Sequence, residues 1–216
     1  EAASSQFVVD GNRLQVSASI GVTFFPKDDV DADQLMRHAD QAMYQAKQSG
    51  RNRYHVFDVA QDAATADQIR ALADIREALG RNEFVLYYQP KVNMRSGAVI
   101  GAEALIRWQH PQRGLLSPAT FMPLIEDHPI SVELGEWVID TALAQIDAWR
   151  AGGLDIPVSV NVGARQLLEG SFSARLSAVL AAHPDVPHDR LELEILETSA
   201  LEDVAQVSEL MYACLE

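Results

Sequence analysis

The sequence predicts an α/β protein whose larger, second part is a parallel sheet or a (β/α) barrel. Two observations lead to this fold class. From residue 83 onward, apolar strand-like segments alternate with helical segments, and such repeated units form parallel sheets and barrels. In addition, 48% of the 216 residues are hydrophobic, which is ordinary for a folded globular protein and too high for a disordered chain.

The chain begins with a pattern typical of a β-hairpin. Residues 6–25 contain two strand-like runs, and Asp10-Gly11 between them is a common hairpin turn. The second run alternates apolar with small or polar residues, which predicts a half-buried strand. Its apolar positions are Val16, Ala18, Ile20 and Val22.

A helix and a short strand are expected to follow the hairpin. Residues 31–49 predict the helix, because one stripe of its surface is apolar and Gly50 follows as a stop signal. Residues 54–57 predict the strand. We therefore place the end of the first unit at residue 58. The helical stripe consists of Leu35, Ala39, Ala42, Met43 and Ala46.

Residues 59–80 predict a helix that links two domains. Its first half is polar and rich in Ala, which suits a linker, and Gly80 ends it. The expected organisation is a first domain over residues 1–58, this linker helix, and a second domain over residues 81–216. The apolar positions at helical spacing are Ile69, Leu72, Ile75 and Leu79.

The second domain is expected to contain four strands and three long helical segments. Ser117-Pro118 is a typical helix start, and Gly152-Gly153 is a typical stop. The strands are expected over residues 84–89, 98–108, 156–162 and 190–196, and the helices over 118–127, 131–153 and 164–183.

The charge of the chain limits the kinds of partner it can bind. There are 17 basic and 31 acidic residues, a formal net charge of −14, which argues against binding of polymeric nucleic acid. A small phosphorylated ligand is still possible, because a local site can oppose the overall charge. No segment is apolar for long enough to span a membrane, and the lone Cys214 suggests a reducing, cytoplasmic location.

Three polar residues interrupt strands that are otherwise apolar. They are Glu103, Asn161 and Glu194, on three successive expected strands. Polar residues late in barrel strands point into the active-site mouth, and three oxygen-bearing side chains there could bind Mg²⁺ or Mn²⁺. A single such residue is more often a rim-exposed or salt-bridged side chain, whereas three on successive strands leave both interpretations open.

Several motifs of the second domain, in order, resemble the EAL domain, a family of phosphodiesterases that cleave cyclic di-GMP. They are QPKV, EALIRWQHP, LGEWV, SVNV, RQL and LELEILE, and Glu103-Ala104-Leu105 is the signature tripeptide. The resemblance implies an incomplete TIM-type barrel. It also implies that Glu103, Asn161 and Glu194 are metal ligands, that Gln89, Leu105 and Arg107 bind substrate, and that Glu197 supports an active-site loop.

The first domain resembles the C-terminal half of a GGDEF domain, the α+β family that makes cyclic di-GMP from GTP. The match rests on VSASIGVTFFP and ADQAMYQAKQSGRNRYHVFD. It implies that Lys47 and Arg51 contact nucleotide phosphates. Their position near a helix end, where cations are favoured in any case, gives a simpler explanation. We expect the chain to be a slice of a tandem GGDEF–EAL protein that forms a homodimer.

The resemblance implies metal-dependent hydrolysis of cyclic di-GMP to pGpG by the parent protein. The family's paired aspartates, catalytic lysine and later metal ligands are expected beyond Glu216, so the 216 residues alone should be inactive. The alternatives are a degenerate module that binds cyclic di-GMP or GTP as a sensor, and a parent with diguanylate cyclase activity. Because a complete barrel needs about 250 residues, we also expect the isolated chain to be prone to aggregation or to need a partner.

Overall fold

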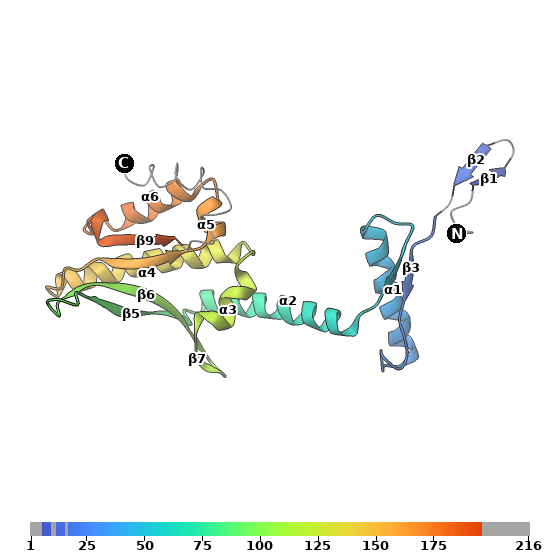
Figure 1. Cartoon of the computed structure of the whole chain (residues 1–216), viewed down its shortest axis with the longest axis horizontal. Coiled ribbons are helices and arrows are strands. Elements are labelled where there is room, and N and C mark those ends of the chain that lie inside the picture. The colour runs from blue at the N-terminus through green and yellow to red at the C-terminus, as the bar shows by residue number, and fades with distance from the viewer. Residues whose placement is uncertain (1–5, 10–11, 16, 196–216) are drawn as a thin grey trace. The chain divides into compact units, whose positions relative to one another are not determined.

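The computed structural model describes residues 6–9, 12–15 and 17–195 (Figure 1). The chain forms two compact units, Glu1–Ile69 and Arg70–Glu216, and each is described by itself. The division falls within helix α2, Val59–Gly80, which occupies the residues expected for the linker helix.

The first unit contains the expected hairpin, but in a shorter form. Strands β1 (Gln6–Val9) and β2 (Asn12–Gln15) are antiparallel, and the Asp10-Gly11 turn lies outside the described residues. The long second strand was wrongly expected to continue to residue 25. Strand β3, Ile20–Val22, is separate and pairs in parallel with β4, Tyr54–Val56.

Helix α1, Ala32–Gln48, packs against β3 through Gly21. Asp31 caps the helix by accepting a hydrogen bond from the Gln34 backbone N–H at 2.8 Å. A Cβ atom on Gly21 would lie only 1.8 Å from the carbonyl oxygen of Ala39, so the helix can approach only because no side chain is present. The helix therefore covers the Gly21 side of β3. The alternation had placed apolar Ile20 on the buried side, but its side chain is 52% exposed.

The sheet of the second unit is mixed. It contains β5 (Phe84–Val92), β6 (Val99–His110), β8 (Val158–Val162) and β9 (Leu191–Ile195) in that order, and β7 (Gly114–Leu116) pairs with β6. Strands β6, β8 and β9 are parallel, as expected. Strands β5 and β6 are antiparallel, because the short connection between them leaves no room for a helical crossover.

Helices connect the parallel strands. Helices α3 (Pro118–Ile125) and α4 (Ile130–Ala151) lie between β6 and β8, and α4 runs along the sheet (Figure 1). The segment expected as one helix over residues 164–183 forms two, α5 (Ala164–Leu168) and α6 (Phe172–Ala182). A 3₁₀ turn, His188–Arg190, leads into β9. Within the described residues, no helix combines the length and apolar character needed to cross a membrane.

One face of the sheet forms the main core of the second unit. Apolar side chains of β8 and β9 pack there against α4 and α6. The fully buried members include Val158, Val160, Ala142, Leu143 and Ile146. Because side chains alternate along a strand, the residues between these apolar positions point to the opposite face. That opposite face carries the polar residues of the candidate site.

Candidate functional site

The strand register places most of the expected site residues on this second face of the sheet. Gln89 of β5 pairs with Glu103 of β6, Glu103 pairs with Ser159 of β8, and Asn161 pairs with Glu194 of β9. Paired residues on neighbouring strands project to the same side of a sheet. Four strands therefore each contribute a polar side chain to one surface.

Glu103 and Asn161 are in direct contact. The Asn161 side chain donates a hydrogen bond from Nδ2 to Oε1 of Glu103 at 2.8 Å. This bond uses the amide nitrogen and leaves Oδ1, the atom that a hard cation prefers, outside it. The structure therefore brings together two of the three residues that the sequence singled out as metal ligands.

Glu194, the third residue, contacts Lys91 of β5. The Lys91 ammonium group donates to Glu194 Oε1 at 2.7 Å and to Glu192 Oε2 at 3.3 Å. Lys91 also donates to the buried Ser159 hydroxyl, which itself donates to Glu192 Oε2 at 2.9 Å. The hydrogen bond from Lys91 lowers the pKa of the Glu194 carboxyl, and the same bond is the main cause that raises the pKa of Lys91.

Lys91, Ser159 and Glu192 were not among the site residues expected from the sequence. The sequence nevertheless contains a pattern that identifies them, because side chains two residues apart on a strand share a face. Lys91 lies two residues after Gln89, Ser159 two residues before Asn161, and Glu192 two residues before Glu194, so each shares a face with an identified residue. A search for every polar residue at these alternate positions would have found all three.

The donor atoms fit a divalent cation, although the side chains are not gathered around one point. Two carboxylates and one amide oxygen are the ligand types that Mg²⁺ and Mn²⁺ prefer. Glu194, however, is engaged by Lys91. Over the part of the chain that the structure describes, no group of three or more His, Cys, Asp or Glu side chains is placed to hold a metal ion.

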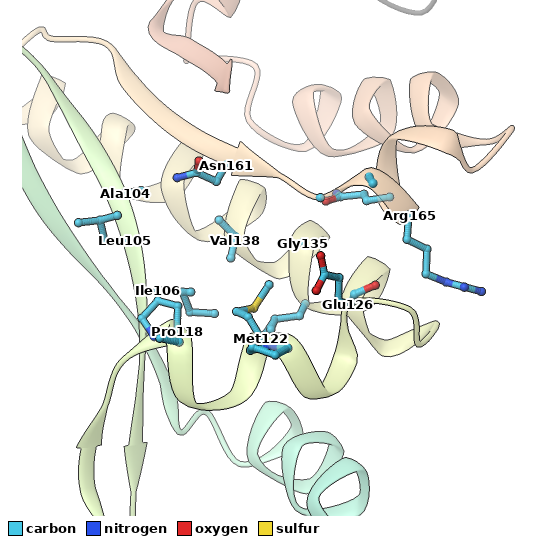
Figure 2. Close-up of a pocket in the computed structure, with 17 residues that line it drawn as sticks. Ala104, Leu105, Ile106, Pro118, Met122, Glu126, Gly135, Val138, Asn161 and Arg165 are labelled. Atoms are coloured by element: carbon cyan, nitrogen blue, oxygen red, sulfur yellow. The ribbon is translucent and has the colours of Figure 1, made fainter. Parts of the chain in front are cut away.

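A pocket of about 450 Å³ lies beside Asn161, between the sheet and helices α3, α4 and α5. Its walls are mostly apolar and include Leu105 and Met122. Figure 2 shows Leu105 and Asn161 on the strands, with Glu126 at the end of α3 on the opposite wall. Arg165 also lines the pocket. Its Nη1 donates to the Asp127 carbonyl oxygen at 2.9 Å, and among the described residues its buried Nε has no hydrogen-bond partner.

The remaining expected residues take different positions. Arg107 donates from Nη1 to the carbonyl oxygen of Ile106 at 2.8 Å, and its guanidinium carbon lies 5.8 Å from the centre of the Tyr87 ring. Gln89 is exposed on β5. Glu197 lies outside the described residues.

Lys47 and Arg51 of the first unit do not share a helix. Lys47 is exposed in the last turn of α1, where its charge is favoured by the helix dipole. Arg51 lies beyond the helix with a positive φ of 58°. Helix α1 ends at Gln48, so both residues lie near its end, as expected from the sequence.

Models of two known domains match the chain in succession. The model described as "Diguanylate cyclase, GGDEF domain" matches residues 1–53, and the EAL domain model matches residues 72–215.

Two curated proteins match over most of this chain. MucR of Pseudomonas aeruginosa, named a bifunctional diguanylate cyclase/cyclic di-GMP phosphodiesterase, is 40% identical over 201 residues, which are 93% of this chain and 29% of MucR. PdeR of Escherichia coli, named a cyclic di-GMP phosphodiesterase, is 35% identical over 190 residues, 88% of this chain and 28% of PdeR. The chain thus spans less than a third of the length of either relative.

Two solved structures share the fold. The PaMucR phosphodiesterase in its c-di-GMP complex has a TM-score of 0.64 and 38% identity, over 68% of this chain and 59% of that one. The EAL enzyme Bd1971, in its cAMP- and cyclic-di-GMP-bound form, has a TM-score of 0.67 and 25% identity, over 87% of this chain and 50% of that one.

Proposed function

We propose a function from the premise that this chain belongs to the EAL domain family over residues 72–215 and carries GGDEF-domain sequence over residues 1–53. The protein that contains it hydrolyses cyclic di-GMP to pGpG. The observation that carries the proposal is the strand register. It places Glu103, Asn161 and Glu194 on three neighbouring strands of one sheet face.

The comparisons confirm the resemblance to both families and the expected fold class. MucR and PdeR both carry phosphodiesterase names, which supports the same reaction for this protein. A cytoplasmic location, a homodimer and binding of GTP near Lys47 and Arg51 stay predictions that follow from the resemblance.

Glu103, Asn161 and Glu194 would hold one or two Mg²⁺ or Mn²⁺ ions. Such ions lower the pKa of bound water and neutralise charge on the phosphate. The chain's own residues would orient the substrate. Arg107 lies on β6, the strand that carries Glu103, and Gln89 lies on the neighbouring strand β5. The planar Arg107 guanidinium suits a phosphate oxygen pair, provided that it exchanges its hydrogen bond to Ile106 for the ligand.

The pocket beside Asn161 has the chemistry to bind one guanine base. Its volume of about 450 Å³ is typical of sites for small ligands, and its apolar walls suit the faces of a planar ring. The Glu126 carboxylate on the wall opposite Leu105 can accept hydrogen bonds, which matches the N–H donors along one edge of guanine. Leu105 would then contact the base, and Asn161 would lie between base and phosphate.

Measured turnover tests the proposal directly. A form of the protein that carries a complete EAL domain is incubated with cyclic di-GMP and Mn²⁺, and the products are separated by chromatography. The proposal expects pGpG, and expects chelation of Mn²⁺ to stop its formation. Tight binding of cyclic di-GMP with no turnover would favour the sensor instead.

A further inference from the structure

Lys91 reaches across the whole polar face of the sheet. It lies on β5, yet its ammonium group contacts Ser159 on β8 and both Glu192 and Glu194 on β9. On β6, the strand next to β5, Gly101 pairs with Lys91. A Cβ atom on Gly101 would lie 3.7 Å from Lys91 Cδ, an ordinary van der Waals distance, so the lysine stem passes directly over Gly101.

The acidic side chains on this face give it a negative charge that a nearby cation stabilises. Glu103 lies on β6, and Glu192 and Glu194 lie on β9, the two strands that flank β8. One sheet face therefore carries three carboxylates, and like charges repel one another. The Lys91 ammonium group lies within hydrogen-bond distance of two of them. It therefore does in this structure what a bound cation would do, and it occupies Oε1 of Glu194, an atom that a metal ion would need.

We propose that Lys91 is a positioning residue that acts as an internal counter-ion of the acidic centre. It holds Glu194 while no divalent cation is bound, and a divalent cation displaces it toward Glu192 and Ser159. This inference rests on the metal-binding role assigned to Glu194 in the proposed function.

The displaced ammonium group keeps two partners. Ser159 and Glu192 are already bonded to each other and to Lys91, so the lysine can leave Glu194 without losing all its hydrogen bonds. Removing the ammonium group should therefore have two opposite effects. The metal-free protein loses its counter-ion and becomes less stable, whereas the metal ion loses a competitor and binds more tightly.

The test is Mn²⁺ binding by a form of the protein that carries a complete EAL domain, monitored by the electron paramagnetic resonance signal of free Mn²⁺. We expect Lys91→Met to lower the Mn²⁺ dissociation constant about tenfold, because a cation next to the metal is removed. Lys91→Arg keeps the charge and should stay near the wild-type value. Lys27→Met removes the same charge from an exposed lysine of the first unit and should change nothing.

Thermal unfolding gives a second readout. Without divalent cations, Lys91→Met should melt below the wild type, and saturating Mn²⁺ should raise its melting temperature by more than it raises that of the wild type. A lysine with a merely structural role would lower stability equally with and without Mn²⁺, and its loss would weaken metal binding or leave it unchanged.

A neutral variant keeps the proposal testable if Lys91→Met does not fold. Ser159→Ala removes an acceptor for the displaced ammonium group without changing any charge. It should weaken Mn²⁺ binding by a few-fold in the wild-type background, because the displaced ammonium group would then have Glu192 as its acceptor instead of both Glu192 and Ser159. Unchanged or tighter binding in this variant would overturn the proposal, as would unchanged or weaker binding in Lys91→Met, or no Mn²⁺ binding by any variant.

These outcomes are separate from the test of the proposed function. If Lys91→Met tightens Mn²⁺ binding but no pGpG is formed, the phosphodiesterase assignment fails and the counter-ion role stands. If pGpG is formed but Lys91→Met leaves Mn²⁺ binding unchanged, the counter-ion role fails and the phosphodiesterase stands.

Discussion

The Asn161 side-chain amide donates a hydrogen bond to Glu103 Oε1 at 2.8 Å and so joins β8 to β6. Asn161→Asp replaces this donor with a second carboxylate. Without divalent cations, we expect the repulsion to lower the free energy of unfolding by roughly 1 kcal/mol. Urea unfolding followed by tryptophan fluorescence measures it, since all three tryptophans, Trp108, Trp137 and Trp149, lie in the second unit.

The control for this variant is Asn93→Asp, which adds the same charge elsewhere. Oδ1 of Asn93 accepts hydrogen bonds from the backbone N–H groups of Arg95 at 3.0 Å and Ser96 at 3.2 Å, and an aspartate keeps that acceptor. We expect little change in this control. Equal stability of Asn161→Asp and the wild type in EDTA would count against the contact between Asn161 and Glu103.

Asp28 makes the first unit sensitive to acid. It is buried, and its Oδ2 accepts hydrogen bonds from Thr23 Oγ1 at 2.5 Å and His38 Nδ1 at 2.8 Å. Burial raises the pKa of Asp28, but the hydrogen bonds from Thr23 and His38, together with the electrostatic attraction of His38, outweigh it and lower the pKa below its usual value of 3.8. Because the folded pKa is the lower one, the stabilisation is complete above 3.8 and is lost as the pH falls through the folded value.

Hydrogen–deuterium exchange of α1 between pH 5 and pH 2.5 measures this effect. Protection should fall with pH, and Asp28→Asn should flatten that dependence while lowering protection at pH 5. Asp29→Asn, on the exposed neighbouring residue, should keep the wild-type slope. The same slope in Asp28→Asn would show that another group governs the acid response.

Gly21→Ala should disrupt the packing of α1 on β3. The added Cβ atom would lie 1.8 Å from the Ala39 carbonyl oxygen, which is backbone and cannot rotate away. Overpacking of this kind typically costs about 1–3 kcal/mol, so α1 should lose hydrogen-exchange protection. Gly80→Ala is the same chemical change in α2, where nothing lies within 4 Å, and it should be neutral or slightly stabilising. Equal protection in both variants would contradict the close contact.

The pocket beside Asn161 should recognise a guanine base through Glu126. Glu126→Gln removes the charge and replaces one acceptor oxygen with an NH₂ donor, so cyclic di-GMP should bind roughly tenfold more weakly, the equivalent of one charge-assisted hydrogen bond. Calorimetry with EDTA present, on a form with a complete EAL domain, measures binding without turnover. Glu133→Gln, an exposed change on α4, is the matched control. Equal affinity in both variants would place the base elsewhere.

The sequence predicted the elements of the second unit well because strand and helix periods are local. It also identified Glu103, Asn161 and Glu194, since a polar residue inside an apolar strand stands out. It could not show that Glu194 would contact Lys91. That contact depends on register across four strands, which local periodicity does not encode.

The first unit was predicted less well for a related reason. The alternation from Val16 to Val22 suggested that Ile20 faces the core. The helix packs instead on the other side, where Gly21 allows backbone contact. A glycine in a strand can mark weak structure or a close approach, and only the position of α1 distinguishes the two.

In the proposed function, the polar face of β6, β8 and β9 is a metal-dependent phosphodiesterase site. The most direct test is the rate of pGpG formation from cyclic di-GMP, with Mn²⁺, by Glu103→Gln in a form that carries a complete EAL domain. Loss of residues that only support metal ligands costs about 10–100-fold, so loss of a ligand should cost at least about 100-fold. Glu77→Gln, the same change on the exposed face of α2, should retain full activity. Wild-type turnover by Glu103→Gln would contradict the account.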